Sequence, residues 1–425
     1  MPVNIFVLGL DEFNLATLQK LPQFAQYHFR PLLSIDELLY AEEIRLTDLL
    51  DKAHRQLKQF EGSVDAIIGY WDFPVSSMLP ILCKQFGLRG PSLESVVKCE
   101  HKYWSRLEQQ KVIDDYPQFA LVDLDHPVAP PPGLKYPLWL KPVKSVVSEL
   151  AFRVTGPQEF YGAVTAIRKG VGRYGKPFEL VLALLDLPPE IARTGGQACL
   201  AESETALEGM LVTVEGYSLN GHVHVYGVVD SIRYPNSSSF LRYQYPSKLP
   251  GKVTDRMVEA TVRVIGQIGL DSWPFNLEFF WDATRDSIDL LEVNPRHSQS
   301  HAILFAHVDG VPNHQCMVSL ALGQDPKLPH RQGNYNIAAK WFLRRFTDGV
   351  VRRSPTSQEV ERLEREVPGT TVKIVAHQGD RLSKLQRQDS YSYEVADIYI
   401  GATDESELLA KYERCTEKLL FEFDR

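Results

Sequence analysis

Several features are scarce in this 425-residue sequence, and each scarcity excludes a class of protein. The five cysteines are scattered with no C-x-x-C pair, which favours buried free thiols over a disulfide framework or a zinc site. Apolar runs such as residues 5–10 are far too short to span a bilayer. Positive charge is not in excess, because the net charge is -8, whereas a protein held on nucleic acid by phosphate contacts needs a basic face.

The N-terminus also lacks a basic segment and an A-x-A-like cleavage site, so no secretory signal is expected. What is present is ordinary for a globular chain, with 44% hydrophobic and 24% charged residues. The length allows about two to four domains. The simplest expectation is a cytoplasmic protein with no membrane and no nucleic-acid partner.

Strands and helices alternate at the start of the chain. Residues 3–9 and 64–70 have the apolar content of buried parallel strands, and residues 36–60 carry apolar positions at helical spacing. This alternation predicts a parallel α/β unit. A helix over about 93–110, a strand over 117–122 and a proline-rich turn at 127–133 are expected next.

The remaining pattern mixes strands and helices. Strands are expected at 138–142, 151–154 and 179–184, with a helix at 157–168. Alternating residues on both sides of Asn220-Gly221 predict a hairpin. Helices at 255–268, 312–322, 358–367 and about 405–421 are expected, with a strand pair at 275–280 and 288–293 and further strands between 336 and 400.

The sharpest chemical pattern lies in that strand pair. Alternate residues of a strand share a face, so Glu292 and Asn294 point the same way, and the short loop at 282–287 lets an antiparallel partner bring Glu278 beside them. Two carboxylates and an amide oxygen suit Mg²⁺. The alternative is a solvated polar face, which the apolar flanking residues disfavour because acids among them are costly unless paired or metal-bound. The pattern alone leaves both interpretations open.

Arg296 follows this strand after a proline, where its guanidinium could grip a phosphate or carboxylate through two hydrogen bonds. The whole segment, NLEFFWD…IDLLEVNPRHSQSH, resembles the terminal signature of ATP-grasp enzymes. It is similar to the branch that contains biotin carboxylase-like and L-amino-acid ligase-like proteins. The order of elements matches over residues 1 to 330.

The resemblance implies a pre-ATP-grasp parallel α/β domain, then a two-lobed ATP-grasp fold and a C-terminal α+β segment. The implied boundaries are 1–95 for the first domain, 96–136 for an entry helix and strand, 137–203 for the lid lobe, 204–330 for the core lobe with the metal site, and 331–425 for the C-terminal segment.

ATP and Mg²⁺ are the cofactors that the resemblance implies. Lys102 matches the lysine that opens the ATP-binding unit, and Lys141 matches the strand lysine that reaches the phosphates. The hinge that meets adenine corresponds to Glu204, Thr205, Ala206 and Leu207. Magnesium would be held by Glu278, Glu292 and Asn294, and Arg296 would be the catalytic residue that steadies the acyl phosphate or tetrahedral intermediate.

Two departures from the family pattern stand out. The loop after Lys141 is usually glycine-rich, since backbone amides must approach phosphates closely. Here residues 144–150 contain no glycine, and Ser145, Ser148 and Lys144 are the candidates to replace it. Leu211 stands where the family often has a glutamate, and the role of the nearby Glu215 stays open.

Two further segments are candidates for substrate contact, with a plain loop as the alternative for each. The predicted substrate residues are Arg233, Ser239, Arg242, His297, Ser298, Ser300 and His301. The turn at residues 70–72 ends a parallel strand, where ligands collect, and is a candidate to close over substrate.

The implied activity is ATP-dependent ligation of a small-molecule carboxylate to an amine, of the amino-acid or dipeptide type, through an acyl phosphate with release of ADP and phosphate. One alternative is a biotin carboxylase-like enzyme that activates bicarbonate. Another is a non-catalytic ATP-binding module, given the loop without glycine. Nothing in the sequence bears directly on oligomeric state; related enzymes are often dimers, so a homodimer stays open.

Overall fold

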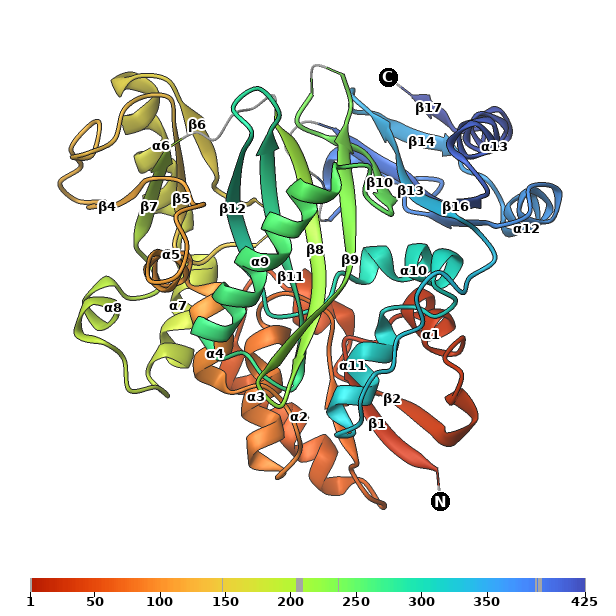
Figure 1. Ribbon diagram of the computed structural model, residues 1–425, viewed down its shortest axis with the longest axis horizontal. Helices are drawn as coiled ribbons and strands as arrows, with labels where there is room; N and C mark the ends of the chain where they lie inside the picture. The colour runs from red at the N-terminus through yellow and green to blue at the C-terminus, as the bar shows by residue number, and fades with distance from the viewer. Residues whose placement is uncertain are drawn as a thin grey trace.

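A computed structural model describes residues 2–146, 148–203, 209–235, 237–386, 388 and 392–424 of the chain. In this part of the chain the strands form a three-stranded parallel sheet, a four-stranded sheet, an eight-stranded antiparallel sheet and a two-stranded ribbon. The eight-stranded sheet lies in the middle, with the other parts around it (Figure 1). The predicted combination of α/β and α+β architecture is therefore confirmed.

The N-terminal part is a parallel sheet in the order β2-β1-β3. Its strands are β1 (Val3–Leu8), β2 (Tyr27–Leu32) and β3 (Ala66–Ile68). Its helical segments are α1 (Glu12–Leu18), η1 (Phe24–Gln26), η2 (Asp36–Tyr40), α2 (Leu46–Gln59) and α3 (Val75–Gln85). The apolar runs of β1 and β3 are buried, as expected for parallel strands covered on both faces. The sequence prediction lacks β2, because His28, Arg30 and Pro31 interrupt its apolar pattern.

The helix expected over 93–110 is wrong in one respect, since the structure has two helices there. They are α4 (Leu93–Glu100) and α5 (Lys102–Gln110). His101 leaves the helical conformation, and its side chain accepts a hydrogen bond from the backbone N–H of Trp104. This N-cap starts a new helix and places Lys102 in its first turn.

A four-stranded antiparallel sheet in the order β4-β7-β5-β6 follows. Its elements are β4 (Phe119–Val122), β5 (Leu138–Pro142), β6 (Phe152–Val154), α6 (Pro157–Gly170), α7 (Gly172–Leu182), α8 (Pro189–Thr194) and β7 (Cys199–Ser203). The strand expected at 179–184 is wrong, because residues 179–182 belong to α7 and the next two residues form the turn after it. Phe178, Val181 and Leu182 are buried at helical spacing while Leu180 and Leu184 are exposed, so the run is an amphipathic helix end.

The central sheet has the order β12-β11-β8-β9-β10-β13-β16-β15. Its strands are β8 (Met210–Leu219), β9 (His222–Arg233), β10 (Phe240–Tyr245), β11 (Trp273–Asp282), β12 (Ser287–Asn294), β13 (Ile337–Arg345), β15 (Thr370–Ile374) and β16 (Tyr393–Ala402). The predicted hairpin is confirmed: Asn220 and Gly221 both have positive φ, and β8 pairs with β9. One sheet thus crosses the predicted boundary at residue 330.

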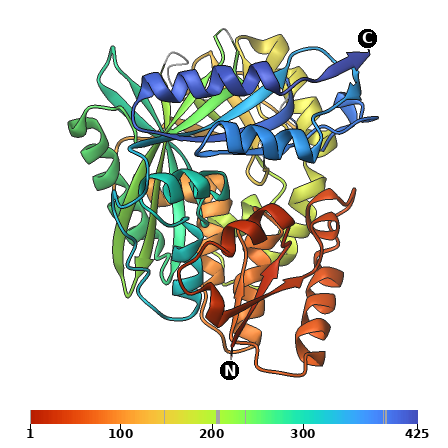
Figure 2. The same cartoon turned by 90° about the vertical axis from the view of Figure 1, so that its right-hand side faces the viewer.

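Helices cover this sheet on both sides. They are α9 (Gly251–Ile268), η3 (Gln299–His301), α10 (Ala302–Val308), α11 (His314–Ala321), α12 (Ser357–Glu366), η4 (Leu382–Lys384) and α13 (Glu405–Lys418), with the ribbon β14 (Val350–Arg353) and β17 (Glu422–Asp424) at the end. Figure 2 shows α12 and α13 at the end of the molecule away from the N-terminal sheet. One apolar core joins Ile5 and Ile67 of the N-terminal sheet to Phe275 of β11. No helix of the described residues is long and apolar enough to cross a membrane.

Candidate active site

The pair of strands β11 and β12 brings the predicted ligands together. They run antiparallel, with Glu278 directly opposite Glu292 and Asn276 directly opposite Asn294. Residues opposite each other on such strands have Cβ atoms about 4.5–5.5 Å apart. The expected strand pairing is confirmed, and the role of the three predicted side chains as metal ligands stays a prediction.

The pKa values of the two facing carboxyl groups are shifted in opposite directions. Burial, reinforced by the charge of Glu292, raises the pKa of Glu278 to about 7. Burial acts to raise the pKa of Glu292 as well, but Lys102 and Lys141 outweigh it and hold that pKa below its usual value. The Nζ of Lys102 lies 2.9 Å from Oε1 of Glu292 and also donates to the carbonyl of Ser145 at 3.2 Å.

These residues fit a magnesium ion on the chemistry of their donors. Two carboxylates face each other with too little positive charge to keep both ionised, so a cation between them would be favourable. The side chain of Asn294 donates through Nδ2 to Asn276, so its Oδ1 is turned away from that bond. Within the described residues no group of three or more His, Cys, Asp or Glu could hold a metal. An ion here would therefore complete its shell with water and phosphate oxygens, as Mg²⁺ commonly does.

Lys141 lies on β5 of the four-stranded sheet and forms part of a buried ionic network. Its Nζ is 2.6 Å from Oε2 of Glu202 on β7, and Arg106 of α5 donates from Nε to the other oxygen of Glu202 at 2.8 Å. Burial acts to raise the pKa of Glu202, but the two cations lower it to about 2. The carboxylate thus fixes the Lys141 ammonium at the sheet that the resemblance assigns to the lid.

Arg106 extends the same network to the strand of the predicted ligands. A β-bulge interrupts the β11–β12 register after Glu278, and Arg106 donates to the carbonyls of Leu290 at 2.8 Å and Leu291 at 2.7 Å. A bulge turns neighbouring carbonyls to one side, where a single guanidinium can take both. Arg106 therefore ties β7 of the four-stranded sheet to the strand that carries Glu292.

The loop without glycine is held in place by a buried lysine. Lys144 is almost fully buried, its Nζ is 3.1 Å from Oε2 of Glu100, and the rings of Phe73 and Phe178 lie 4.7 and 4.9 Å away. Lys144 thus anchors the loop in the interior, which leaves it no free path to a phosphate. This placement is against the phosphate contact considered for Lys144 from the sequence.

Two serines of this loop were expected to contact ATP. Ser145 is buried and its carbonyl accepts from Lys102, whereas Ser148 is exposed. Ser148 and Leu150 have φ of 57° and 59°, the left-handed region in which glycine is favoured. The backbone therefore follows a glycine-like path without glycine, and phosphate contact by Ser145 and Ser148 stays a prediction. The predicted hinge residues Glu204, Thr205, Ala206 and Leu207 lie outside the described residues.

Arg296 links the site to the N-terminal part. Its Nε donates to Oδ1 of Asp72 at 2.5 Å, and Asp72 belongs to the turn that follows β3. Both side chains are mostly buried, with 19% and 23% of their surface exposed. The turn after β3 therefore supplies an acidic residue that orients the predicted catalytic guanidinium, and closure of this turn over substrate stays a prediction.

The predicted substrate residues on β9 and β10 lie in different surroundings. The guanidinium of Arg233 lies 5.2 Å from the ring of Phe280, which is two residues beyond Glu278 on the same face of β11. Ser239 is buried and bonds to Ser392. Arg242 pairs with Glu405 of α13 and lies over Trp341, in the packing beneath the C-terminal helices. Of these three, Arg233 is the one whose contact lies on the face of Glu278.

The segment after Arg296 is largely interior. His297 is fully buried, and burial together with the charge of His314 lowers its pKa well below the usual value. His301 is buried and lies 2.8 Å from Glu215, which also accepts from the backbone N–H of Ser298. Ser300 is partly exposed. The observed contacts of His297, Ser298 and His301 are structural, and substrate contact by these four residues stays a prediction.

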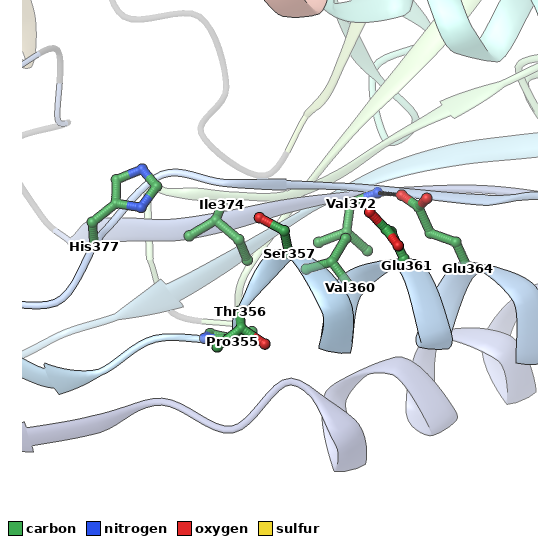
Figure 3. Close-up of a pocket in the computed structure, with 9 residues that line it drawn as sticks. All are labelled: Pro355, Thr356, Ser357, Val360, Glu361, Glu364, Val372, Ile374 and His377. Carbon is green, nitrogen blue, oxygen red and sulfur yellow. Dashed lines mark hydrogen bonds between the residues drawn. The ribbon is translucent and has the colours of Figure 1, made fainter.

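A separate surface hollow lies between α12 and β15 (Figure 3). It is lined by Pro355, Thr356, Ser357, Val360, Glu361, Glu364, Val372, Ile374 and His377. None of the predicted site residues is among them. Glu364 accepts a hydrogen bond from the backbone N–H of Val372 at 2.8 Å, on the outer side of the edge strand β15. The hollow therefore marks the place where α12 covers the edge of the sheet at β15.

Three residues of the site are missing from the sequence prediction: Asn276, Arg106 and Glu202. Asn276 carries a readable signal, because it is a polar residue two positions before Glu278 on the same strand face. Glu202 is an acid that follows three buried apolar residues of the same strand, which indicates a buried partner. Arg106 gives no such signal, since an arginine on a polar helix usually faces solvent.

Similarity to known proteins is found in the sequence of one segment and in the fold of the whole chain. A family model described as "Carbamoyl-phosphate synthase L chain, ATP binding domain" matches residues 245–329, the segment that contains β11 and β12. No curated relative matches the chain by sequence. The family match is therefore local, and full-length likeness comes from solved structures.

Those structures cover nearly the whole chain at low identity. An L-amino acid ligase from Bacillus licheniformis is 15% identical, with a TM-score of 0.73 over 100% of this chain and 99% of that chain. A biotin carboxylase from Campylobacter jejuni is 15% identical, with a TM-score of 0.69 over 99% and 92%. A phosphoribosylglycinamide synthetase from Anaerococcus prevotii is 12% identical, with a TM-score of 0.66 over 100% of both chains. This chain therefore shares its fold over nearly its whole length with these three enzymes, and residues 245–329 match a family model of an ATP-binding domain.

Proposed function

We propose that this protein is an ATP-dependent carboxylate–amine ligase of the amino-acid or dipeptide type. The observation that carries the proposal is the meeting of Glu278 and Glu292 on facing strands, with Asn294 beside them and Lys102 bonded to Glu292. Carboxylates for a divalent cation and ammonium groups for phosphates are the parts that phosphoryl transfer requires. The likeness to an L-amino acid ligase over the whole chain supports the choice of substrates.

The proposed roles of the site residues follow from their charges. Glu278, Glu292 and Asn294 would hold magnesium, which when bound neutralises the charge of ATP phosphates. Lys102 and Lys141 would bind phosphate oxygens from the side of α5 and β5, where their positions are fixed by Glu292 and Glu202. Arg296, oriented by Asp72, would stabilise negative charge on the activated carboxylate.

The reaction then proceeds in two balanced steps. A carboxylate oxygen attacks the γ-phosphorus of ATP, the bond from that phosphorus to the bridging oxygen breaks, and ADP leaves with the electron pair. The amine nitrogen of the second substrate attacks the acyl carbon, and the bond to the phosphate oxygen breaks. Phosphate leaves, and the amine proton passes to solvent or a nearby base, which gives an amide. Water must be kept out between the steps, since it would hydrolyse the acyl phosphate.

A screen of amino-acid pairs for ADP formation, followed by mass spectrometry of the products, tests the proposal. We expect ADP release that depends on both substrates and a product mass equal to their sum minus water. ADP release that requires bicarbonate, with label from bicarbonate in the product, would instead support the biotin carboxylase-like alternative. Tight ATP binding without turnover under all of these conditions would leave a nucleotide-binding module.

A further inference from the structure

Asn276 of β11 connects two residues of the candidate site. Its side chain is almost fully buried and lies opposite Asn294 across the β11–β12 pair. Its Nδ2 donates to the backbone carbonyl of Arg296 at 2.9 Å, and its Oδ1 accepts from Nδ2 of Asn294 at 3.0 Å. One amide thus contacts both a predicted metal ligand and the backbone of the predicted catalytic residue.

The direction of these bonds decides which atom Asn294 can offer to a cation. The two ends of an amide are similar in shape, so its orientation must come from its partners. The Arg296 carbonyl can only accept, so it requires the Nδ2 of Asn276. The Oδ1 of Asn276 must then face Asn294 and take its Nδ2. The Oδ1 of Asn294 then lies on the side of its amide that faces away from Asn276, where it can bind a cation.

The simpler interpretation is that Asn276 only secures the turn after β12. That turn already has another support, because the indole N–H of Trp273 donates to the carbonyl of Pro295 at 3.1 Å. A second donor one residue further along would add little to the turn alone. Its Oδ1, however, makes a bond that orients a residue on the face of Glu278 and Glu292.

We infer that Asn276 is a positioning residue that fixes the amide of Asn294 with its oxygen toward the metal site, and that holds the Arg296 backbone at the same time. This inference rests on the proposed function, since it assumes a divalent cation at Glu278, Glu292 and Asn294. Partners of metal ligands commonly change metal affinity by about 10- to 100-fold when they are removed.

The test is the affinity for Mn²⁺, measured by titration without turnover, alone and with a non-hydrolysable ATP analogue. Asn276→Leu keeps the branching of the side chain at Cγ and removes both bonds, and Asn276→Ala provides a second, smaller variant that admits water. We expect each to weaken Mn²⁺ binding by about tenfold or more. Thermal unfolding establishes which variants are folded, and either folded variant decides the question.

Asn4 offers a matched control on another strand. It too donates to a backbone carbonyl, that of Ser63, and accepts from a side chain, that of Arg30, but it lies in the N-terminal sheet. Asn4→Leu should therefore leave Mn²⁺ affinity unchanged. A loss in Asn4→Leu equal to that in Asn276→Leu would mean that the effect is general and would overturn the inference.

The double variant Asn276→Leu/Asn294→Ala separates positioning from a merely structural role. If Asn276 acts through Asn294, the double variant binds Mn²⁺ no more weakly than Asn294→Ala alone. Full affinity in the folded single variant, or additive losses in the double variant, would overturn the inference while the proposed function stands. If instead the unmodified protein binds neither Mn²⁺ nor the ATP analogue, the proposed function itself fails.

Discussion

At the scale of single residues, the site is defined by an imbalance of charge. Glu278 and Glu292 face each other, yet only Glu292 has a direct bond to a cation, Lys102. The raised pKa of Glu278 is the consequence in the protein without metal. Removal of either carboxylate therefore has two effects. It removes a predicted metal ligand, which lowers activity, and it relieves the repulsion between the two carboxylates, which raises stability.

Glu292→Ala should lower ATP turnover by at least about 100-fold and leave the protein folded. The side chain of Glu292 is 39% exposed, so its removal leaves no large cavity, and it also relieves repulsion of Glu278. ADP release and the melting temperature without metal are the measurements. Glu259→Ala, which removes a surface carboxylate on α9, is the control. Normal turnover in Glu292→Ala would remove this residue from the mechanism.

At the scale of elements, the loop between β5 and β6 is anchored by buried contacts. The corresponding loop of the family that the sequence resembles is usually rich in glycine. Lys144 pairs with Glu100 of α4, and the hydroxyls of Ser76 and Ser77 in α3 donate to the same carboxylate. The loop start is further fixed by the bond from the backbone N–H of Lys102 to the carbonyl of Val143. We expect this loop to be a rigid wall of the site.

Breaking the anchor should cost both stability and nucleotide affinity. Lys144→Met leaves Glu100 buried without its cation, which typically costs about 3–5 kcal/mol. Adding Glu100→Gln should restore part of the lost melting temperature, because the isolated charge is removed. The affinity for ATP should fall in Lys144→Met, since the loop start also positions Lys102. A loss below about 1 kcal/mol would show that the pair is no more than a weak surface contact.

The sequence could predict elements whose signals are local. Asn220-Gly221 indicates its hairpin, and the alternation around Glu292 indicates both the strand and its polar face. It misplaces α7, because an apolar run of this length fits a strand and a helix end equally well. The anchor at Lys144 and the bonds of Arg106 to β12 join residues far apart in sequence. No local pattern could reveal them, since they arise only when separate sheets pack together.

The C-terminal strand β16 carries Glu394, from which we expect a pH dependence of stability. Burial and the nearby charge of Asp397 raise the pKa of Glu394 to about 7 from an ordinary value of 4.5, although Arg344 and Lys340 act in the opposite direction. The folded protein therefore binds this proton more tightly than the unfolded chain. Stability contributed by Glu394 is present at low pH and is lost as pH rises through this window, up to about 7.

Glu394→Gln should remove this dependence. The melting temperature of the unmodified protein should fall relative to the variant as pH is raised from 5 to 8, by a difference worth roughly 1–3 kcal/mol. Thermal unfolding at several pH values measures it. The surface variant Glu259→Gln is the control and should follow the unmodified protein. Parallel curves for Glu394→Gln and the unmodified protein would contradict the assignment.

At the scale of the whole molecule, separate parts of the chain meet at the β11–β12 pair. Lys102 and Arg106 come from α5, Lys141 and Glu202 from the four-stranded sheet, and Asp72 from the N-terminal sheet. The bond between Asp72 and Arg296 joins residues 224 positions apart. It makes the N-terminal part a contributor to the orientation of the predicted catalytic arginine.

Asp72→Asn tests this connection between the parts, because it keeps an acceptor for Arg296 and removes the charge. The charge-assisted hydrogen bond that orients the guanidinium should weaken to a neutral one, and kcat should fall by about tenfold, since hydrogen bonds to charged groups are roughly twice as strong as neutral ones. KM for ATP should change little, because Lys102 and Lys141 are held by other carboxylates. Steady-state kinetics gives both constants.

A matched substitution separates this effect from a general loosening of the N-terminal sheet. Asp65 also accepts hydrogen bonds in that sheet, from the backbone N–H of Asn4 and from Ser63, but it lies before β3, whereas Asp72 follows that strand. Asp65→Asn should therefore leave kcat unchanged, even if it lowers the melting temperature. Equal losses of kcat in both variants, or a rise in KM for ATP without a change in kcat in Asp72→Asn, would contradict the role of Asp72. A selective loss of kcat would instead support a contribution of the N-terminal part to catalysis through the bond from Arg296 to Asp72.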